Sequence, residues 1–95
     1  MKHVSELNIA SFADALRVCM QREAQGLGTL EENCDPLDEY RQKGLVDAEL
    51  IEYVVNVIVG QVSHREEFQD LLALVVTSPA DSLVQNIKRF MDSVA

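Results

Sequence analysis

Tryptophan is absent from this chain, and tyrosine and phenylalanine together number five, so its 47% of hydrophobic residues are mainly aliphatic. With so few aromatic side chains, the sequence lacks the stacking platforms on which single-stranded nucleic acids bind. No stretch approaches the roughly 20 apolar residues that span a bilayer. Glu6 and Asp14 interrupt the apolar region that a signal peptide requires. We therefore expect a single cytoplasmic domain over residues 1–95, with a loose lead-in at residues 1–4 and no membrane partner.

Positive charge is also scarce, because eight lysines and arginines stand against 16 aspartates and glutamates and give a formal net charge of -8. The basic residues are scattered, whereas binding to nucleic acid or to an anionic membrane needs clustered lysine and arginine. We therefore expect no nucleic-acid partner. The excess of carboxylates instead favours attraction toward a basic protein surface.

The longest apolar stretch, residues 48–62, predicts a buried helix at the centre of the fold. Its polar positions recur every three or four residues and form one narrow stripe, which consists of Glu49, Glu52, Asn56, Gly60 and Ser63. A strand is the alternative, because seven of the apolar residues are β-branched. The helix is favoured because the run is longer than a usual strand. In addition, Asp47 can act as an N-cap, with Val46 and Ile51 placed as a hydrophobic staple.

Apolar residues spaced by three and four predict further main helices, which span residues 6–25, 64–76 and 79–94. Gly26 and Gly28 are stop signals for the first of these helices. Ser63 is expected to cap the second, and Ser78 followed by Pro79 to start the third. The short connections in the second half of the chain favour antiparallel neighbours.

The segment between the first two main helices is the least regular. Asp35 and Pro36 fit the N-cap and the first position of a short helix over residues 36–43. The TLEE sequence that begins at Thr29 has the form of a capping box, but little apolar periodicity follows it. Residues 27–35 are therefore expected to form an acidic loop. The predicted fold class is all-α, a compact bundle of four main helices and one short helix.

Five carboxylates lie close together without a basic residue among them, and they are Glu31, Glu32, Asp35, Asp38 and Glu39. One interpretation is a solvated loop and helix face. The other is a docking surface for a basic protein, where charge speeds encounter and disfavours wrong partners. These five residues are the predicted partner-binding residues.

Residues with metal-binding or catalytic chemistry are few and lack a recognisable spacing. The histidines and cysteines, His3, Cys19, Cys34 and His64, do not have the pairwise spacing of zinc ligands. The acidic segment lacks the alternating oxygens and central glycine of a calcium loop, and no phosphate-binding residues follow the two glycines. We therefore expect no metal, no cofactor and no catalytic residue.

The two cysteines have different expected environments. Cys19 lies on an apolar helix face and is expected in the core. Cys34 is expected just before a helix N-terminus, which can lower the pKa of a thiol, although the neighbouring Asp35 opposes this effect. In an exported protein, a bridge between Cys19 and Cys34 is feasible.

These features predict a non-catalytic interaction protein: a small acidic adaptor, a chaperone, or an inhibitor of the immunity type that binds a basic or apolar protein surface. One alternative is a homodimeric structural or regulatory domain, because the middle helix and residues 71–76 are apolar on many sides and Val18 lies on an otherwise polar face. A weaker alternative is a small-molecule binder or enzyme with a pocket between helices, near Cys34, His64 or Tyr40.

Overall fold

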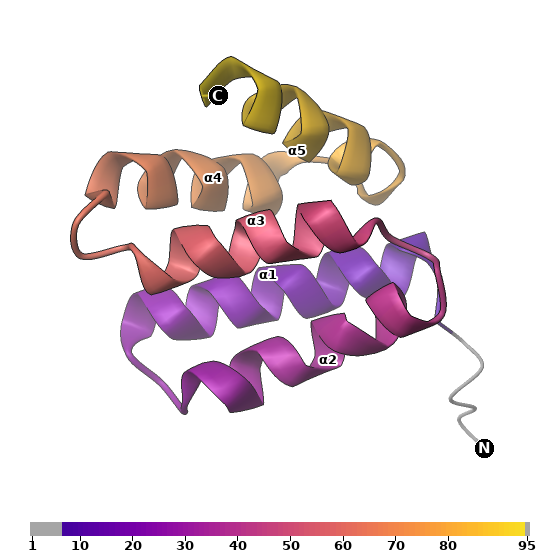
Figure 1. The fold of residues 1–95 in the computed structure, drawn as a ribbon, viewed down its shortest axis with the longest axis horizontal. Helices are drawn as coiled ribbons and strands as arrows, with labels where there is room; N and C mark the ends of the chain where they lie inside the picture. Colours follow the sequence, from indigo (N-terminus) through magenta and orange to yellow (C-terminus); the bar gives the residue numbers. More distant parts are fainter. Residues whose placement is uncertain (1–6, 95) are drawn as a thin grey trace.

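The computed structural model describes residues 7–94, and two of its helices, α1 (Ile9–Gln25) and α3 (Ala48–Val59), each contact the same three neighbouring helices. The other three helices each contact both of them, and they are α2 (Leu30–Gln42), α4 (Arg65–Thr77) and α5 (Ala80–Val94) (Figure 1). No strand occurs in this part of the chain. The predicted all-α bundle is confirmed, and α3 is a helix rather than the alternative strand.

The core is aliphatic, as the composition predicts, with Phe12 and Phe68 as its largest fully buried side chains. On α1 the buried positions follow the expected spacing of three and four, through Leu16 to Met20. Burying an aliphatic side chain stabilises the fold by roughly 1.5–3 kcal/mol. That gain outweighs the few tenths of a kcal/mol that each β-branched residue of α3 costs in helix propensity.

The ends of α1 follow their sequence signals. Asn8 is the N-cap: its Oδ1 accepts from the Ser11 amide at 2.9 Å, and the Ser11 Oγ accepts from the Asn8 amide at 2.9 Å. Gly26 adopts a left-handed conformation with φ of 71° and ends the helix. Gly26 is one of the two predicted stop signals, whereas residues 7 and 8, which the sequence predicts to be helical, precede the helix; the predicted start at residue 6 lies outside the described residues.

The corner between α4 and α5 is held by a side chain from α1. Arg17 donates from Nε to the Val75 carbonyl at 3.2 Å and from Nη2 to the Ser78 carbonyl at 2.7 Å. The Arg17 guanidinium satisfies carbonyls at the C-terminal end of α4, and its positive charge interacts favourably with the helix dipole there. The Ser78 hydroxyl accepts from Asn86 at 3.0 Å, and α5 begins at Ala80, one residue after the predicted start at Pro79.

The region around α3 and α4 departs from the prediction at three helix ends. Helix α3 ends at Val59 rather than at residue 62, and Val62 is 90% exposed. Asp47 is the N-cap residue but makes no capping hydrogen bond, because its carboxylate pairs with Lys88 Nζ of α5 at 2.9 Å. The expected cap by Ser63 is also wrong, since His64 occupies the N-cap of α4 without a side-chain bond.

The largest correction concerns α2, which is 13 residues long and begins at Leu30. The TLEE capping box is present: the Thr29 Oγ1 accepts from the Glu32 amide at 3.1 Å, and Glu32 Oε1 accepts from the Thr29 amide at 3.0 Å. Residues 30–35, expected as an acidic loop, are therefore helical, and Pro36 lies inside the helix rather than at its start. All five helices have 12 residues or more, so the division into four main helices and a short one is only roughly consistent with the structure.

Candidate functional site

The exposed side of α2 carries three acidic side chains in a row. Glu31, Asp35 and Glu39 are four residues apart, so they lie on one stripe of the helix, and all three are exposed. None of them forms a hydrogen bond or ion pair through its side chain with another of residues 7–94. We name these three residues the α2 acidic face.

The other two predicted partner-binding residues, Glu32 and Asp38, form hydrogen bonds at the two ends of α2. Glu32 takes part in the capping box at the N-terminus of the helix. The Asp38 carboxylate accepts from Arg41 Nε at 2.8 Å and from Gln42 Nε2 at 2.6 Å, and it also pairs with the Arg41 Nη2 group. The five carboxylates therefore share one helix, but the structure separates three unpaired charges from two that are engaged locally.

A groove of about 550 Å³ runs between α1 and α2, next to the α2 acidic face. It is lined by Asp14, Ala15, Val18 and Arg22 of α1 and by Glu32, Asn33 and Pro36 of α2. The apolar part of the lining comes from Ala15, Val18 and Pro36, and Val18 is 54% exposed. We name this feature the α1–α2 groove.

One wall of the groove is fixed by a buried amide that the sequence analysis missed. Asn33 is 4% exposed, and its Oδ1 accepts from Arg22 Nε at 2.8 Å. Its Nδ2 donates to Glu23 Oε2 at 2.7 Å and to the Leu27 carbonyl at 3.0 Å. Asn33 thus ties α1, the turn and α2 together, as a buried polar group must be hydrogen-bonded to be stable. No residue type or spacing near it signals this role.

The two cysteines meet between α1 and α2, with 3.8 Å between their Sγ atoms. Cys19 is 1% exposed, as expected for a core residue, whereas Cys34 is half-buried. The hydrogen bond to Cys34, together with burial, raises the pKa of the Cys19 thiol well above its ordinary value. The same hydrogen bond lowers the pKa of the Cys34 thiol. The prediction that Cys34 lies just before a helix N-terminus is wrong, because Cys34 lies within α2.

Tyr40 and His64, which the sequence suggested as neighbours of a pocket, do not line the α1–α2 groove. Tyr40 is buried, packs edge-on against Phe12 and donates to the Ser11 Oγ at 2.8 Å. His64 is exposed and lines a separate depression of about 110 Å³ with Tyr53 and Glu67. Within residues 7–94, no group of three or more histidine, cysteine or acidic side chains is placed to hold a metal ion.

In the described part of the chain, none of the helices has the length and apolar character needed to cross a membrane. Comparison of the chain with models of known protein families, with curated proteins and with solved structures found no match.

Proposed function

We propose that the protein is a non-catalytic interaction module that binds a basic protein segment along the α1–α2 groove and the α2 acidic face. The observation that carries this proposal is the position of three exposed, unpaired carboxylates beside an apolar groove. Carboxylates attract and orient a cationic partner, while apolar contacts supply most of the binding free energy. An adaptor, a chaperone or an inhibitor of a basic protein each uses such a surface.

The lining of the groove defines the segment that fits it. An apolar side chain of the partner contacts Val18 and Pro36, and flanking lysines or arginines reach the α2 acidic face and Asp14. Asp14 and Arg22 lie eight residues apart on α1, which corresponds to about 12 Å along the helix. Because Arg22 places a positive charge at its end of the groove, a basic segment binds in one preferred direction.

Pro36 adds a further recognition group. Proline has no amide hydrogen, so α2 cannot use residue 36 to satisfy the carbonyl of Glu32 one turn earlier. Both residues line the groove. A lysine, an arginine or a backbone amide of the partner can donate to that carbonyl.

The test is capture of partners from the native host by the wild-type protein and by two triple variants of equal net charge. The first variant replaces the α2 acidic face with amides, as Glu31→Gln, Asp35→Asn and Glu39→Gln. We expect a stoichiometric partner with a basic binding segment, whose affinity for this variant falls by roughly threefold to 150-fold, since each of the three exposed charge pairs contributes about 0.2–1 kcal/mol.

The matched control removes three exposed carboxylates from other helices, as Glu52→Gln, Asp70→Asn and Asp92→Asn. Both triple variants have a net charge of -5, because three carboxylates are lost from a chain of charge -8. We expect the control to bind the partner within about twofold of the wild type. Equal weakening by the two variants, or the absence of any stoichiometric partner, contradicts the proposal.

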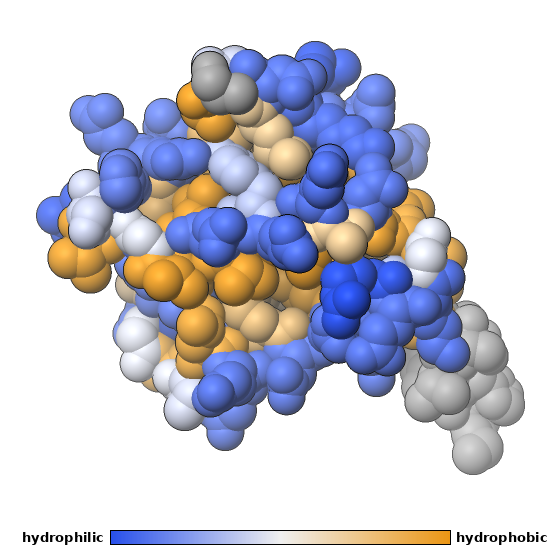
Figure 2. Space-filling model, in the orientation of Figure 1, coloured by the Kyte–Doolittle hydropathy of each residue, from blue (hydrophilic) through white to orange (hydrophobic). Residues whose placement is uncertain are grey.

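A second candidate, self-association, is favoured by the valines at the C-terminal end of α3. Val59 is 62% exposed, and Val62 in the following turn is more exposed still. Figure 2 shows hydrophobic surface over the C-terminal half of α3, bordered by hydrophilic side chains. Contiguous apolar surface of this kind is typical of an interface. Sedimentation analysis should show a dimer that Val62→Glu dissociates, and a wild-type monomer at millimolar concentration excludes this candidate.

A further inference from the structure

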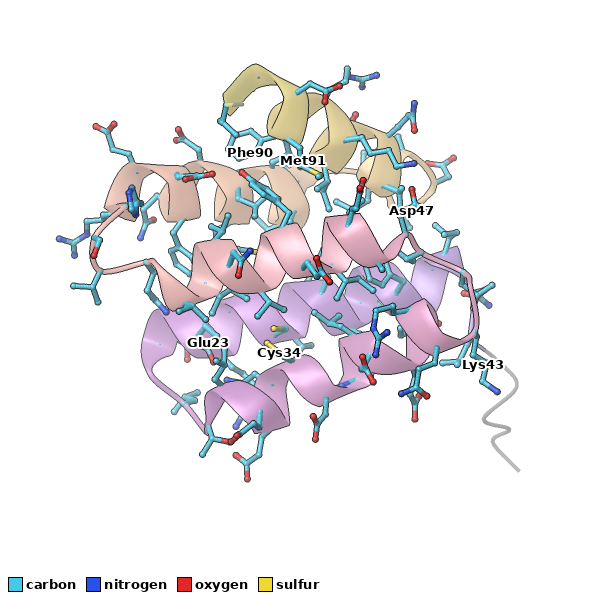
Figure 3. The ribbon with its side chains drawn as sticks, in the orientation of Figure 1. Glu23, Cys34, Lys43, Asp47, Phe90 and Met91 are labelled. Atoms are coloured by element: carbon cyan, nitrogen blue, oxygen red, sulfur yellow. The ribbon has the colours of Figure 1, made fainter. Side chains whose placement is uncertain are left out.

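The sulfur atoms of Cys19 and Cys34 lie side by side between α1 and α2, and Figure 3 shows the pair next to the Cys34 label. Their separation of 3.8 Å exceeds the length of a disulfide bond, about 2.05 Å, by less than 2 Å. Closing this gap requires the two sulfur atoms to approach each other by less than 2 Å. Both thiols are free in the structure.

We propose that Cys19 and Cys34 form a reversible intramolecular disulfide by exchange with a low-molecular-weight disulfide such as glutathione disulfide. The proposal stands on the distance between the two sulfurs and on their different exposure. It does not depend on the proposed binding function. Because Cys19 is 1% exposed, a bond between Cys19 and a second chain is disfavoured.

The order of reaction follows from exposure. Cys34 is half-buried and reachable from solvent, whereas Cys19 is buried beneath it. The hydrogen bond from Cys19 lowers the pKa of the Cys34 thiol, although burial, Glu23 and Asp35 oppose that shift. Since the thiolate is the attacking form, Cys34 is the first thiol to react and Cys19 is the second.

The two steps balance in atoms and electrons. The Cys34 thiolate attacks one sulfur of glutathione disulfide, which forms a mixed disulfide and releases one glutathione thiolate that takes up a proton. Cys19 then loses its proton to solvent and attacks the Cys34 sulfur, which releases the second glutathione. Two protein thiols are oxidised to one disulfide, and one glutathione disulfide is reduced to two glutathione thiols.

The bond joins the two helices that form the α1–α2 groove and closes a loop with a sequence separation of 15 residues. A cross-link of this length restricts the unfolded chain more than the native helices, so oxidation should raise Tm, by about 12–24 °C. It also fixes the spacing between α1 and α2.

The experiment incubates the reduced, full-length protein with glutathione disulfide under native conditions and follows its intact mass. The wild type should end about 2 Da lighter than its reduced form, without a retained adduct and without a covalent dimer on a non-reducing gel. Dithiothreitol should reverse the change and the rise in Tm. A wild type that keeps glutathione on Cys34, remains unmodified, or forms covalent dimers overturns the proposal.

Single substitutions separate the two steps. Cys19→Ala should stop at the mixed disulfide and keep an adduct of about 305 Da on Cys34. Cys34→Ala should resist modification while folded and react only in urea, because the remaining thiol is buried. If either variant proves unfolded by circular dichroism, the disulfide is located instead by proteolysis of the oxidised wild type. A peptide that links Cys19 to Cys34 supports the proposal, and its absence overturns it.

Discussion

Asn33 shows how much a single side chain contributes to the shape of the candidate site. Its three hydrogen bonds join Arg22, Glu23 and the Leu27 carbonyl from a buried position. We expect Asn33→Ala to lower the free energy of unfolding by about 1–3 kcal/mol, because three hydrogen bonds made by a buried side chain are lost. Urea denaturation measures this effect. Asn56→Ala, on the exposed side of α3, is the control and should change stability by less than about 0.5 kcal/mol. Equal stability of the two variants contradicts the role given to Asn33.

Tyr53 predicts how stability depends on pH. Burial raises the pKa of its phenol above the ordinary value, and the hydrogen bond to Glu67 Oε2 at 2.6 Å and the charge of Glu67 add to this shift. The folded protein therefore holds this proton more tightly than the unfolded chain. The resulting stabilisation is complete below the unfolded pKa of about 10 and is lost as the pH rises through the higher folded pKa.

The Tyr53 contribution is isolated by comparing the wild type with Tyr53→Phe in urea at about pH 9 and about pH 11. The wild type should lose more unfolding free energy over this interval than the variant, because the variant lacks the Tyr53 phenol, which ionises more readily in the unfolded chain. Equal losses in the two proteins rule out the coupling between this phenol and folding.

At the scale of elements, α1 and α3 could be predicted from sequence because their apolar residues repeat at helical spacing and are buried. The first half of α2 could not, because Asn33 is its single buried side chain before Leu37 and is polar. The capping box at Thr29 is visible in the sequence. The contacts of α2 with α1, which also stabilise this helix, leave no local sequence pattern. The acidic residues could be recognised, but the groove beside them depends on how α1 and α2 pack together, which places Val18 and Pro36 in its lining. Val62 resembled a buried residue because periodicity alone does not mark where α3 ends.

Pro36 lies inside α2, where a proline is expected to lower the stability of the protein. A proline inside a helix removes one backbone hydrogen bond and costs about 3 kcal/mol, partly offset because proline also restricts the unfolded chain. We expect Pro36→Ala to raise the free energy of unfolding by about 1–2 kcal/mol, as measured by urea denaturation. The chain's other proline provides the control, since Pro79 precedes α5 and suits its position. Pro79→Ala should lower stability by up to about 1 kcal/mol. A Pro36→Ala variant no more stable than the wild type shows that α2 carries no such cost.

At the scale of the whole molecule, acidic residues outnumber basic ones two to one, and the ion pairs within residues 7–94 involve three aspartates. Net repulsion between surface carboxylates therefore opposes folding at low ionic strength. We expect Tm to rise as sodium chloride increases from about 10 mM to about 500 mM, because the Debye length falls from roughly 30 Å to below 8 Å. A protein stabilised mainly by its surface ion pairs would lose stability over the same range.

The two triple variants of net charge -5 show where that repulsion originates. The three carboxylates of the α2 acidic face repel one another at four-residue spacing, by about 0.2–0.5 kcal/mol for each neighbouring pair. The acidic-face variant should therefore show a smaller rise of Tm with salt than the variant with carboxylates removed from three different helices. Such a difference means that the chain retains clustered charge at a cost to its own stability, as expected if a basic partner neutralises it. Identical salt dependence in the two variants means that repulsion is spread evenly over the surface and that the α2 acidic face has no special electrostatic role.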